Sequence, residues 1–375
     1  MKSGHTLIVN LSFLLASLLC SVIGAEIALR FYYGSQDNVP LYLASEACPY
    51  IYGLNPGHPE INSMGMRDRE YPRKRSPNTL RILLLGDSVT YGSGVKADKT
   101  FAKKCEQRLL KSLGNVEVIN AGIPGYTTYN EVFFYQNKAK DYKADIVILA
   151  LCLNDIVNPQ LHWMDNEAAV SKRHVQDAAI PNLVDHQQRV SSLISSYARY
   201  SWVKHLALYR LINSYMQDRW LRERRQHFDK RLVEIDGRNW PTYVTFEDTL
   251  SLQVLMDDRT PEWEWMTALL DQLFTSIRDQ GATPILLILP LGYQLDTDYP
   301  FLPQARIKTF CQRKEILTID PLPAFRLHQN EQIYLDSLDI WHFTEKGHSI
   351  VADELSAFID SLVVHRTDSI PKLPI

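Results

Sequence analysis

Short apolar runs recur between residues 81 and 320, and amphipathic stretches separate them. The runs are RILLL (81–85), VEVIN (116–120), DIVILAL (145–151), TPILLILP (283–290) and EILTID (315–320). Runs of this length, rich in Leu, Ile and Val, are typical of strands that are buried on both faces. Because helical patterns separate them, the sequence predicts an α/β fold with a parallel sheet covered by helices on both sides.

Three of the intervening stretches carry helix signals. TFAKKCEQRLLKSLG predicts a helix with Thr100 as N-cap and Gly114 as its C-terminal stop. YNEVFFYQNKAKDY (129–142) predicts the helix that follows the second strand, and a further helix is expected to start near Thr344. Helices in these places supply the crossovers that parallel strands need.

The start of the chain is apolar. Thr6 to Ala25 contains no charged residue, and a bilayer core needs about 20 such residues. We expect residues 1–33 to form an uncleaved single-pass anchor, with the N-terminus inside and the rest outside the cytoplasm, periplasmic or extracellular. A cleaved signal peptide, which would make the protein secreted, and a buried helix of a soluble protein are the alternatives. Lipid modification at Cys20 is disfavoured by the large Leu19 before it.

The rest of the chain divides by composition. We expect a linker and N-terminal extension over 34–78, a catalytic domain over 79–365 and a tail over 366–375. A long aromatic-rich helical stretch, about 160–262, is too long for a simple crossover and is interpreted as an insertion near the site. It contains a basic run, which predicts a solvated helix face, with contact to an anionic glycan or lipid head group as the alternative. The run consists of Arg219, Arg222, Arg224 and Arg225.

Composition and charge narrow the function. The formal net charge of -3 argues against nucleic acid as a partner, because phosphate binding needs a basic excess. The five cysteines form no CxxC pair and no metal-ligand spacing, and the chain has no P-loop, dinucleotide fingerprint or zinc-protease motif. We therefore expect neither a cofactor nor a metal. The oligomeric state is left open by the sequence.

Three polar or small residues lie just past the ends of the first three predicted strands, one after each strand. They are Ser88, Gly122 and Asn154. The carboxyl ends of parallel strands meet at one edge of the sheet, where α/β proteins bind their ligands. The placement therefore predicts that these residues share one site.

A serine hydroxyl becomes a nucleophile when a histidine takes its proton and an acid orients that histidine. Asp339 and His342 supply this pair in a D-x-x-H loop before the last predicted helix. The competing histidine, His348, lies inside that helix and is assigned a structural or surface role. The competing acid, Asp336, is assigned to the loop. Each motif alone is common, and their order and placement together carry the prediction.

These motifs together resemble the SGNH/GDSL hydrolase family. The matching blocks are GDSVTYG, NAGIPGYTT, LNDI and DIWHFTEKGH, and the upstream NSMGMRDREY resembles a segment of membrane-anchored bacterial members. Apart from the insertion, the resemblance covers roughly Asn62 to Leu362. It implies a flavodoxin-like three-layer αβα sandwich.

The resemblance also implies a role for each matching residue. Ser88 would attack an ester carbonyl, His342 would act as general base and then as general acid, and Asp339 would orient His342. The Ser88 and Gly122 backbone N–H groups and the Asn154 side-chain amide would form the oxyanion hole. The chain departs from the family pattern at Cys152, where a glycine is usual. The departure puts the substrate in doubt more than the reaction.

We expect a serine esterase that hydrolyses an O-acyl ester, such as an O-acetyl ester, on a small molecule or on a cell-envelope glycan or lipid. An O-acyltransferase with the same site is the first alternative, because the insertion would let a lid exclude water. A non-catalytic glycan-binding or assembly protein on a retained fold is the alternative from another class.

Overall fold

The computed structural model describes residues 2–33, 41–43, 53–153, 155, 261–295, 302–335 and 339–369, with short pieces between 206 and 241. Its centre is a five-stranded sheet in which every pair of neighbours is parallel. The strands are β3 (Leu80–Gly86), β4 (Val116–Gly122), β5 (Ile146–Cys152), β8 (Thr283–Leu289) and β9 (Leu317–Ile319). All five predicted strands are confirmed.

The strand order is β4-β3-β5-β8-β9. Renumbered along the chain, this is the 2-1-3-4-5 order of flavodoxin-like folds, so the predicted three-layer sandwich is confirmed. The order places β3 between β4 and β5. The three strand ends that precede Ser88, Gly122 and Asn154 are therefore neighbours.

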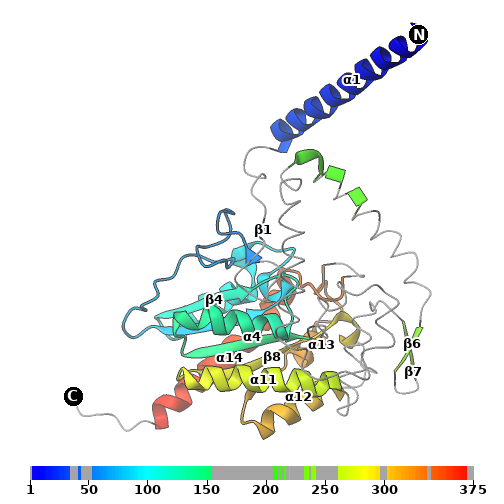
Figure 1. Cartoon of the computed structure of the whole chain (residues 1–375). Coiled ribbons are helices and arrows are strands. Elements are labelled where there is room, and N and C mark those ends of the chain that lie inside the picture. Colours follow the sequence, from blue (N-terminus) through cyan, green and yellow to red (C-terminus); the bar gives the residue numbers. More distant parts are fainter. Residues whose placement is uncertain are drawn as a thin grey trace.

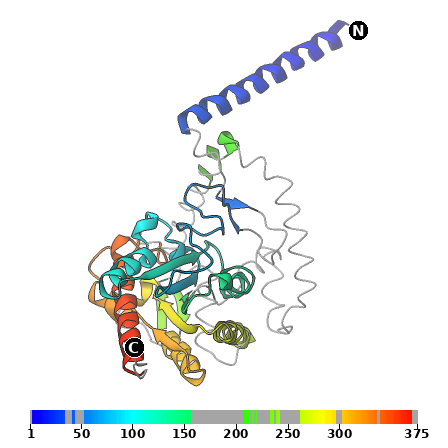
Figure 2. The same cartoon turned by 90° about the vertical axis from the view of Figure 1, so that its left-hand side faces the viewer.

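Helices cover both faces of the sheet (Figures 1 and 2). On one face, α3 (Phe101–Ser112) packs against α14 (Glu345–Ser369), and on the other α4 (Thr128–Asn137) packs against α11 (Pro261–Asp279). The Thr100 side chain accepts a hydrogen bond from the Lys103 N–H, as expected of the predicted N-cap. Helix α12 (Leu302–Arg313) packs against β9, and the short α13 (Leu322–Leu327) packs against α14.

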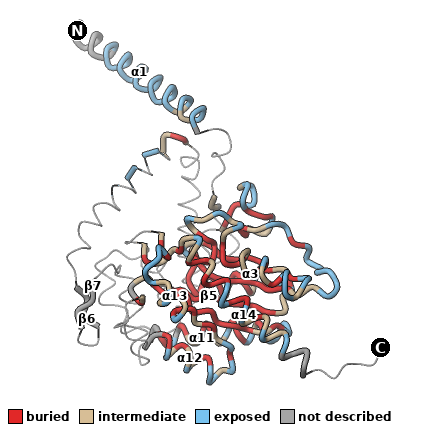
Figure 3. The backbone as a smooth tube through the Cα atoms, turned by 180° about the vertical axis from the view of Figure 1, so that it is seen from behind, coloured by how far each residue is buried: buried red, intermediate tan, exposed pale blue. Residues whose placement is uncertain are grey.

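The core lies between these layers, as the buried strands in Figure 3 show. Arg81, at the start of β3, is the one charged side chain among the largest fully buried ones in the described chain. Its guanidinium pairs with Glu117 at 2.6 Å and donates to the carbonyls of Tyr142 and Pro72. The charge is tolerated because these partners satisfy its donors.

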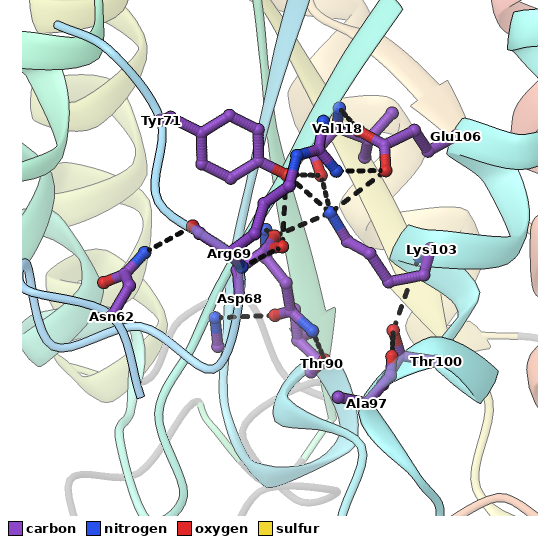
Figure 4. Close-up of polar contacts among 12 residues, drawn as sticks. Asn62, Asp68, Arg69, Tyr71, Thr90, Ala97, Thr100, Lys103, Glu106 and Val118 are labelled. Carbon is purple, nitrogen blue, oxygen red and sulfur yellow. Dashed lines mark hydrogen bonds and ion pairs between the residues drawn. The ribbon is translucent and has the colours of Figure 1, made fainter. Parts of the chain in front are cut away.

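Strand β4 forms one edge of the sheet, and side chains from residues 68–71 and from α3 cover that edge (Figure 4). Asp68 accepts the Asn120 N–H at 2.8 Å, and Glu106 accepts the Val118 N–H at 2.8 Å. The Tyr71 hydroxyl donates to the Val118 carbonyl at 3.2 Å. Side chains thus satisfy backbone groups that an edge strand would otherwise offer to another chain.

The N-terminal helix α1 (Lys2–Tyr33) stands away from the domain (Figure 3). Residues Val9–Tyr32 have a mean hydropathy of 2.0, and none of that stretch is buried in the protein. The helix is longer than the predicted Thr6–Ala25 run. By length and composition it suits either a membrane anchor or a signal sequence.

The remaining elements are small. The pairs β1 (Tyr42–Leu43) with β2 (Gly53–Leu54), and β6 (Leu232–Ile235) with β7 (Arg238–Pro241), are antiparallel. Most of the predicted 160–262 insertion lies outside the described residues.

The last helix runs further than the sequence predicts. Helix α14 continues to Ser369, past the expected domain end at 365, so the predicted 366–375 tail begins as helix. Pro371 is the first helix breaker after this point, and the residue before a proline avoids helical geometry.

Candidate active site

Ser88 lies where the chain turns from strand β3 into the short helix α2 (Ser88–Tyr91). The Asp87 side chain caps this helix by accepting the Val89 N–H at 2.9 Å. Gly92 ends it in a left-handed conformation, with φ of 84°. The turn holds the Ser88 side chain partly exposed at the carboxyl edge of the sheet, and its N–H has no partner among the described residues.

His342 and Asp339 reach the same place from the loop before α14. The distance from His342 Nε2 to Ser88 Oγ is 2.8 Å, and that from His342 Nδ1 to Asp339 Oδ2 is 2.8 Å. Asp339 Oδ1 also accepts the His342 backbone N–H at 2.9 Å. The next residue, the fully buried Phe343, forms a β-bridge with Tyr334 and fixes the loop against the core. The structure therefore brings all three predicted side chains into one hydrogen-bonded chain.

The surroundings of His342 and Asp339 determine which of the two side chains carries a proton. Burial by itself lowers the pKa of His342, but the hydrogen bond and charge of Asp339, helped by Asp87, raise it above the ordinary 6.5. Burial likewise opposes ionisation of Asp339, and the hydrogen bonds from His342 outweigh it and lower the pKa of Asp339. Asp339 thus stays a carboxylate while Nδ1–H donates to it, which leaves Nε2 able to accept the Ser88 proton.

Gly122 is not placed as predicted. Strand β4 extends through it, and its buried N–H donates to Asn120 Oδ1 at 3.0 Å. A Cβ at this position would lie 2.2 Å from the Tyr91 backbone nitrogen. The glycine is therefore needed so that α2 can pack against β4, and its N–H is not available to an oxyanion.

A different backbone donor lies three residues further on. Ile123 to Tyr126 form a turn in which the Tyr126 N–H donates to the Ile123 carbonyl at 3.1 Å, with Pro124 second and Gly125 third. Gly125 is exposed, has φ of 77°, and its N–H has no partner in the described part of the chain. Asn154, the third predicted donor, lies outside the described residues, although the neighbouring Cys152 and Asp155 are described.

Most of the chain matches a known family model. Residues 84–350 match the model of the GDSL-like lipase/acylhydrolase family, a range that includes Ser88, Asp339 and His342. The chain belongs to this family. It is an ester-hydrolysing enzyme with the SGNH hydrolase fold. A comparison with curated protein sequences gives no significant match.

Similar solved structures are esterases. One is a two-domain esterase active on acetylated mannans, with 16% identity, a TM-score of 0.40, and coverage of 79% of this chain and 52% of that one. Another is the acetyl xylan esterase AlAXEase, with 13% identity, a TM-score of 0.41, and coverage of 74% and 99%. A catalytic mutant of the acetylxylan esterase Axe2 from Geobacillus stearothermophilus has 12% identity, a TM-score of 0.39, and coverage of 75% and 93%.

Three carboxyl groups are buried around the nucleophile turn of this GDSL-like enzyme. They belong to Asp87, Glu131 and Asp155, each at most 2% exposed. Asp155 Oδ2 accepts the Cys152 N–H at 2.9 Å and so ties Asp155 to the end of β5. Neither Glu131 oxygen has a hydrogen-bond partner among the described residues. Burial, and then repulsion from Asp87, raise the pKa of Glu131 and Asp155 well above the usual range.

This cluster of buried carboxyl groups was not predicted from the sequence. Glu131 lies in the first turn of α4, where an acid is ordinarily a surface residue that interacts with the helix dipole. The sequence signal that was available is the apolar and aromatic surroundings of Glu131 in YNEVFFY, which favour a buried helix face.

Cys152 and the competing histidine, His348, both lie inside the protein. Cys152 ends β5 and is 1% exposed, so its thiol is part of the core. His348 is fully buried in α14, where its Nδ1 accepts the Phe101 N–H at 3.1 Å and its ring stacks on Phe101. The structural role predicted for His348 is confirmed, and Asp336 lies outside the described residues. No group of three metal-binding side chains occurs in the described ranges.

Proposed function

We propose that the enzyme is a serine esterase in which Ser88 is the nucleophile, His342 the general base and Asp339 the residue that orients His342. The observation that carries this proposal is the continuous chain of hydrogen bonds from Ser88 Oγ through both ring nitrogens of His342 to Asp339. A retained fold without catalysis would need neither the 2.8 Å contact at Ser88 nor the carboxylate behind the histidine.

The geometry supports acyl transfer in two steps. Ser88 Oγ bonds to the ester carbonyl carbon as its proton passes to His342 Nε2. The tetrahedral intermediate then collapses, the bond to the leaving alkoxide breaks, and His342 returns the proton to that oxygen. In the second step a water molecule gives its proton to His342 and attacks the acyl-Ser88 carbonyl. Free acid leaves, and Ser88 recovers its proton.

The oxyanion needs preorganised donors on the other side of the carbonyl. Two backbone N–H groups suit this role, those of Ser88 and Gly125, because both lie at the carboxyl edge of the sheet and neither has a partner in the described chain. By its place in the family motif, the Asn154 amide would be the third donor. Each such donor contributes about 3 kcal/mol to stabilising the transition state.

The substrate we propose is an O-acyl ester, such as an acetyl ester, carried by a cell-envelope glycan or lipid. We further propose that α1 anchors the enzyme in a membrane with the catalytic domain outside the cytoplasm. Support comes from the uncharged, unburied stretch in α1 together with the family's acylhydrolase chemistry. A single-pass anchor would keep the site near acylated material at that surface.

The test compares Ser88→Ala with Ser93→Ala, a serine five residues away in the same segment. The full-length enzyme in detergent is assayed on an aryl acetate and labelled with a fluorophosphonate. We expect Ser88→Ala to lose at least about a thousandfold in kcat and all labelling, with an unchanged melting temperature. Ser93→Ala should keep both. Residual turnover in Ser88→Ala near that of the unmodified enzyme would refute the assignment.

A further inference from the structure

Exposed apolar side chains gather in one place outside α1. In the described part of the chain beyond α1, eight large apolar residues are exposed, and four of them fall between 211 and 216. Among these, Ile212 is 50% exposed, and Tyr215 and Met216 are each 62% exposed. Each described residue between 207 and 219 has helical geometry, and positions 212, 215 and 216 have the i, i+3, i+4 spacing typical of one helix face. A soluble domain rarely leaves a contiguous apolar face uncovered.

A direct contact joins this helical segment to the end of α1. The Ala207 N–H donates to Glu26 Oε1 at 3.0 Å, and the Leu208 N–H donates to Glu26 Oε2 at 2.9 Å. Glu26 also forms an ion pair with Arg30 at 2.7 Å. Figures 1 and 2 both show the helical pieces of this segment beside the end of α1.

The position of Glu26 fixes the depth of this contact. Glu26 is the first charged residue after the uncharged Thr6–Ala25 stretch, so it stands where a spanning helix leaves the hydrocarbon. A carboxylate at that depth needs partners, and two N–H groups at a helix start together with Arg30 provide them. The contact therefore holds Ala207 and Leu208 at the level of the lipid head groups.

We propose that the helical segment beginning at Ala207 is an interfacial element that lies on the same bilayer that α1 crosses, with Ile212, Tyr215 and Met216 inserted among the lipids. This inference rests on the proposed membrane anchor. Ile212 follows four residues after the contact of Leu208 with α1, and a tyrosine at head-group level is typical of membrane interfaces. In the sequence, four arginines follow between 219 and 225, which suits anionic head groups. The segment would hold the catalytic domain against the membrane and favour acyl esters at its surface.

The test measures depth with a fluorophore at single cysteines in the full-length enzyme. Cys20 and Cys48 are replaced by alanine, while Cys105, Cys152 and Cys311 are buried and protected from labelling. Vesicles contain equal parts of phosphatidylcholine and phosphatidylglycerol, with bromine either near the head groups or in the middle of the acyl chains. Met216→Cys reports on the segment and Leu14→Cys on the anchor. Leu327→Cys is the matched control, because Leu327 is apolar and 85% exposed on the domain.

We expect the label at 216 to be quenched more by shallow than by central bromine, the label at 14 mainly by central bromine, and the label at 327 only by aqueous iodide. Iodide quenching at 216 equal to that at 327 would overturn the inference while leaving the anchor intact. A label at 216 protected from both bromine and iodide would overturn it too, because a protein would then cover the face. Failure of central bromine to quench at 14 would overturn the anchor proposal itself.

A second variant tests the link to α1. Glu26→Ala removes both acceptor oxygens without touching the apolar face. We expect the label at 216 to lose most of its shallow quenching, while the label at 14 keeps its own. Unchanged quenching at 216 would overturn the role of Glu26 in placing the segment.

Discussion

We expect the buried His348 to make the folded enzyme less stable in acid. Its Nδ1 accepts the Phe101 N–H, so the ring is neutral with hydrogen on Nε2, which has no partner in the described chain. Protonating Nδ1 would break that hydrogen bond and bury a cation. Burial, followed by repulsion from Lys104, His342 and Arg67, lowers the pKa of His348 from 6.5 to about 3.

The sign and size follow from linkage. Below pH 6.5 the unfolded chain binds a proton that the folded chain refuses, so stability falls as the pH drops from 6.5 towards about 3. Each pH unit in this window costs about 1.36 kcal/mol. At pH 5 the free energy of unfolding should be about 2 kcal/mol lower than above pH 6.5. This figure depends only on the pKa of His348 in the unfolded chain, because pH 5 lies well above its pKa in the folded enzyme.

The assay is urea unfolding of the full-length enzyme in detergent between pH 7.5 and pH 5, for the unmodified enzyme and His348→Asn. The asparagine Oδ1 can accept the Phe101 N–H but does not titrate. We expect His348→Asn to start less stable and to lose about 2 kcal/mol less on acidification. Phe101→Leu is the control, since it removes the stacked ring but keeps the histidine, and it should retain the original pH slope. Parallel losses in the unmodified enzyme and His348→Asn would refute the reasoning.

Two further predictions concern the site. In Asp339→Asn, kcat should fall by about 10³- to 10⁴-fold on an aryl acetate. Asp87 is then the only carboxylate still opposing the effect of burial, so the pKa of His342 should fall and the acid limb of kcat/KM should move to lower pH. An unmoved limb would contradict the role of Asp339. Gly122→Ala should lower the free energy of unfolding by about 1–3 kcal/mol, because its Cβ would meet the Tyr91 backbone. Gly125→Ala should instead favour a flipped Pro124–Gly125 peptide, which turns the N–H away from the oxyanion. We expect kcat to fall by about 10²-fold while the melting temperature stays near normal. If Gly122→Ala lost activity and Gly125→Ala lost only stability, Gly122 would be the donor.

Much of the fold could be predicted because parallel strands buried on both faces leave an unambiguous pattern. Each of the five apolar runs became a strand, and the Thr100 cap was visible in the sequence. The covering of the β4 edge could not be predicted, because Asp68 and Glu106 come from segments whose contact with β4 is set by tertiary packing. The sequence gives no local stop signal for α14 before Pro371, so its end at Ser369 was not predictable.

The candidate site also has residues that could be predicted from the sequence and residues that could not. The order of motifs predicts that Ser88, Asp339 and His342 meet, and the structure brings them together because a strand end and one short loop fix their side chains at one edge. Gly122 was expected from the family motif and from a strand that ends at residue 120, whereas β4 runs to 122 and makes this glycine a buried strand residue. The Pro124–Gly125 dipeptide was the overlooked signal. It is typical of a type II turn, whose third residue has positive φ and an N–H that the turn itself does not use.

The buried carboxyl groups show why composition could not reveal the electrostatics of the site. From the sequence, Asp87 is expected to cap a helix, Glu131 to lie at the start of a helix and Asp155 to lie in a loop. The folded structure buries all three carboxyl groups. Three buried carboxyls this close cannot all ionise. Asp87 accepts the Val89 N–H and is attracted by His342, whereas Glu131 has no such partner in the described chain, so Asp87 is the group best able to hold the charge. Keeping Glu131 and Asp155 protonated would limit the negative charge beneath Ser88, where the reaction develops an oxyanion.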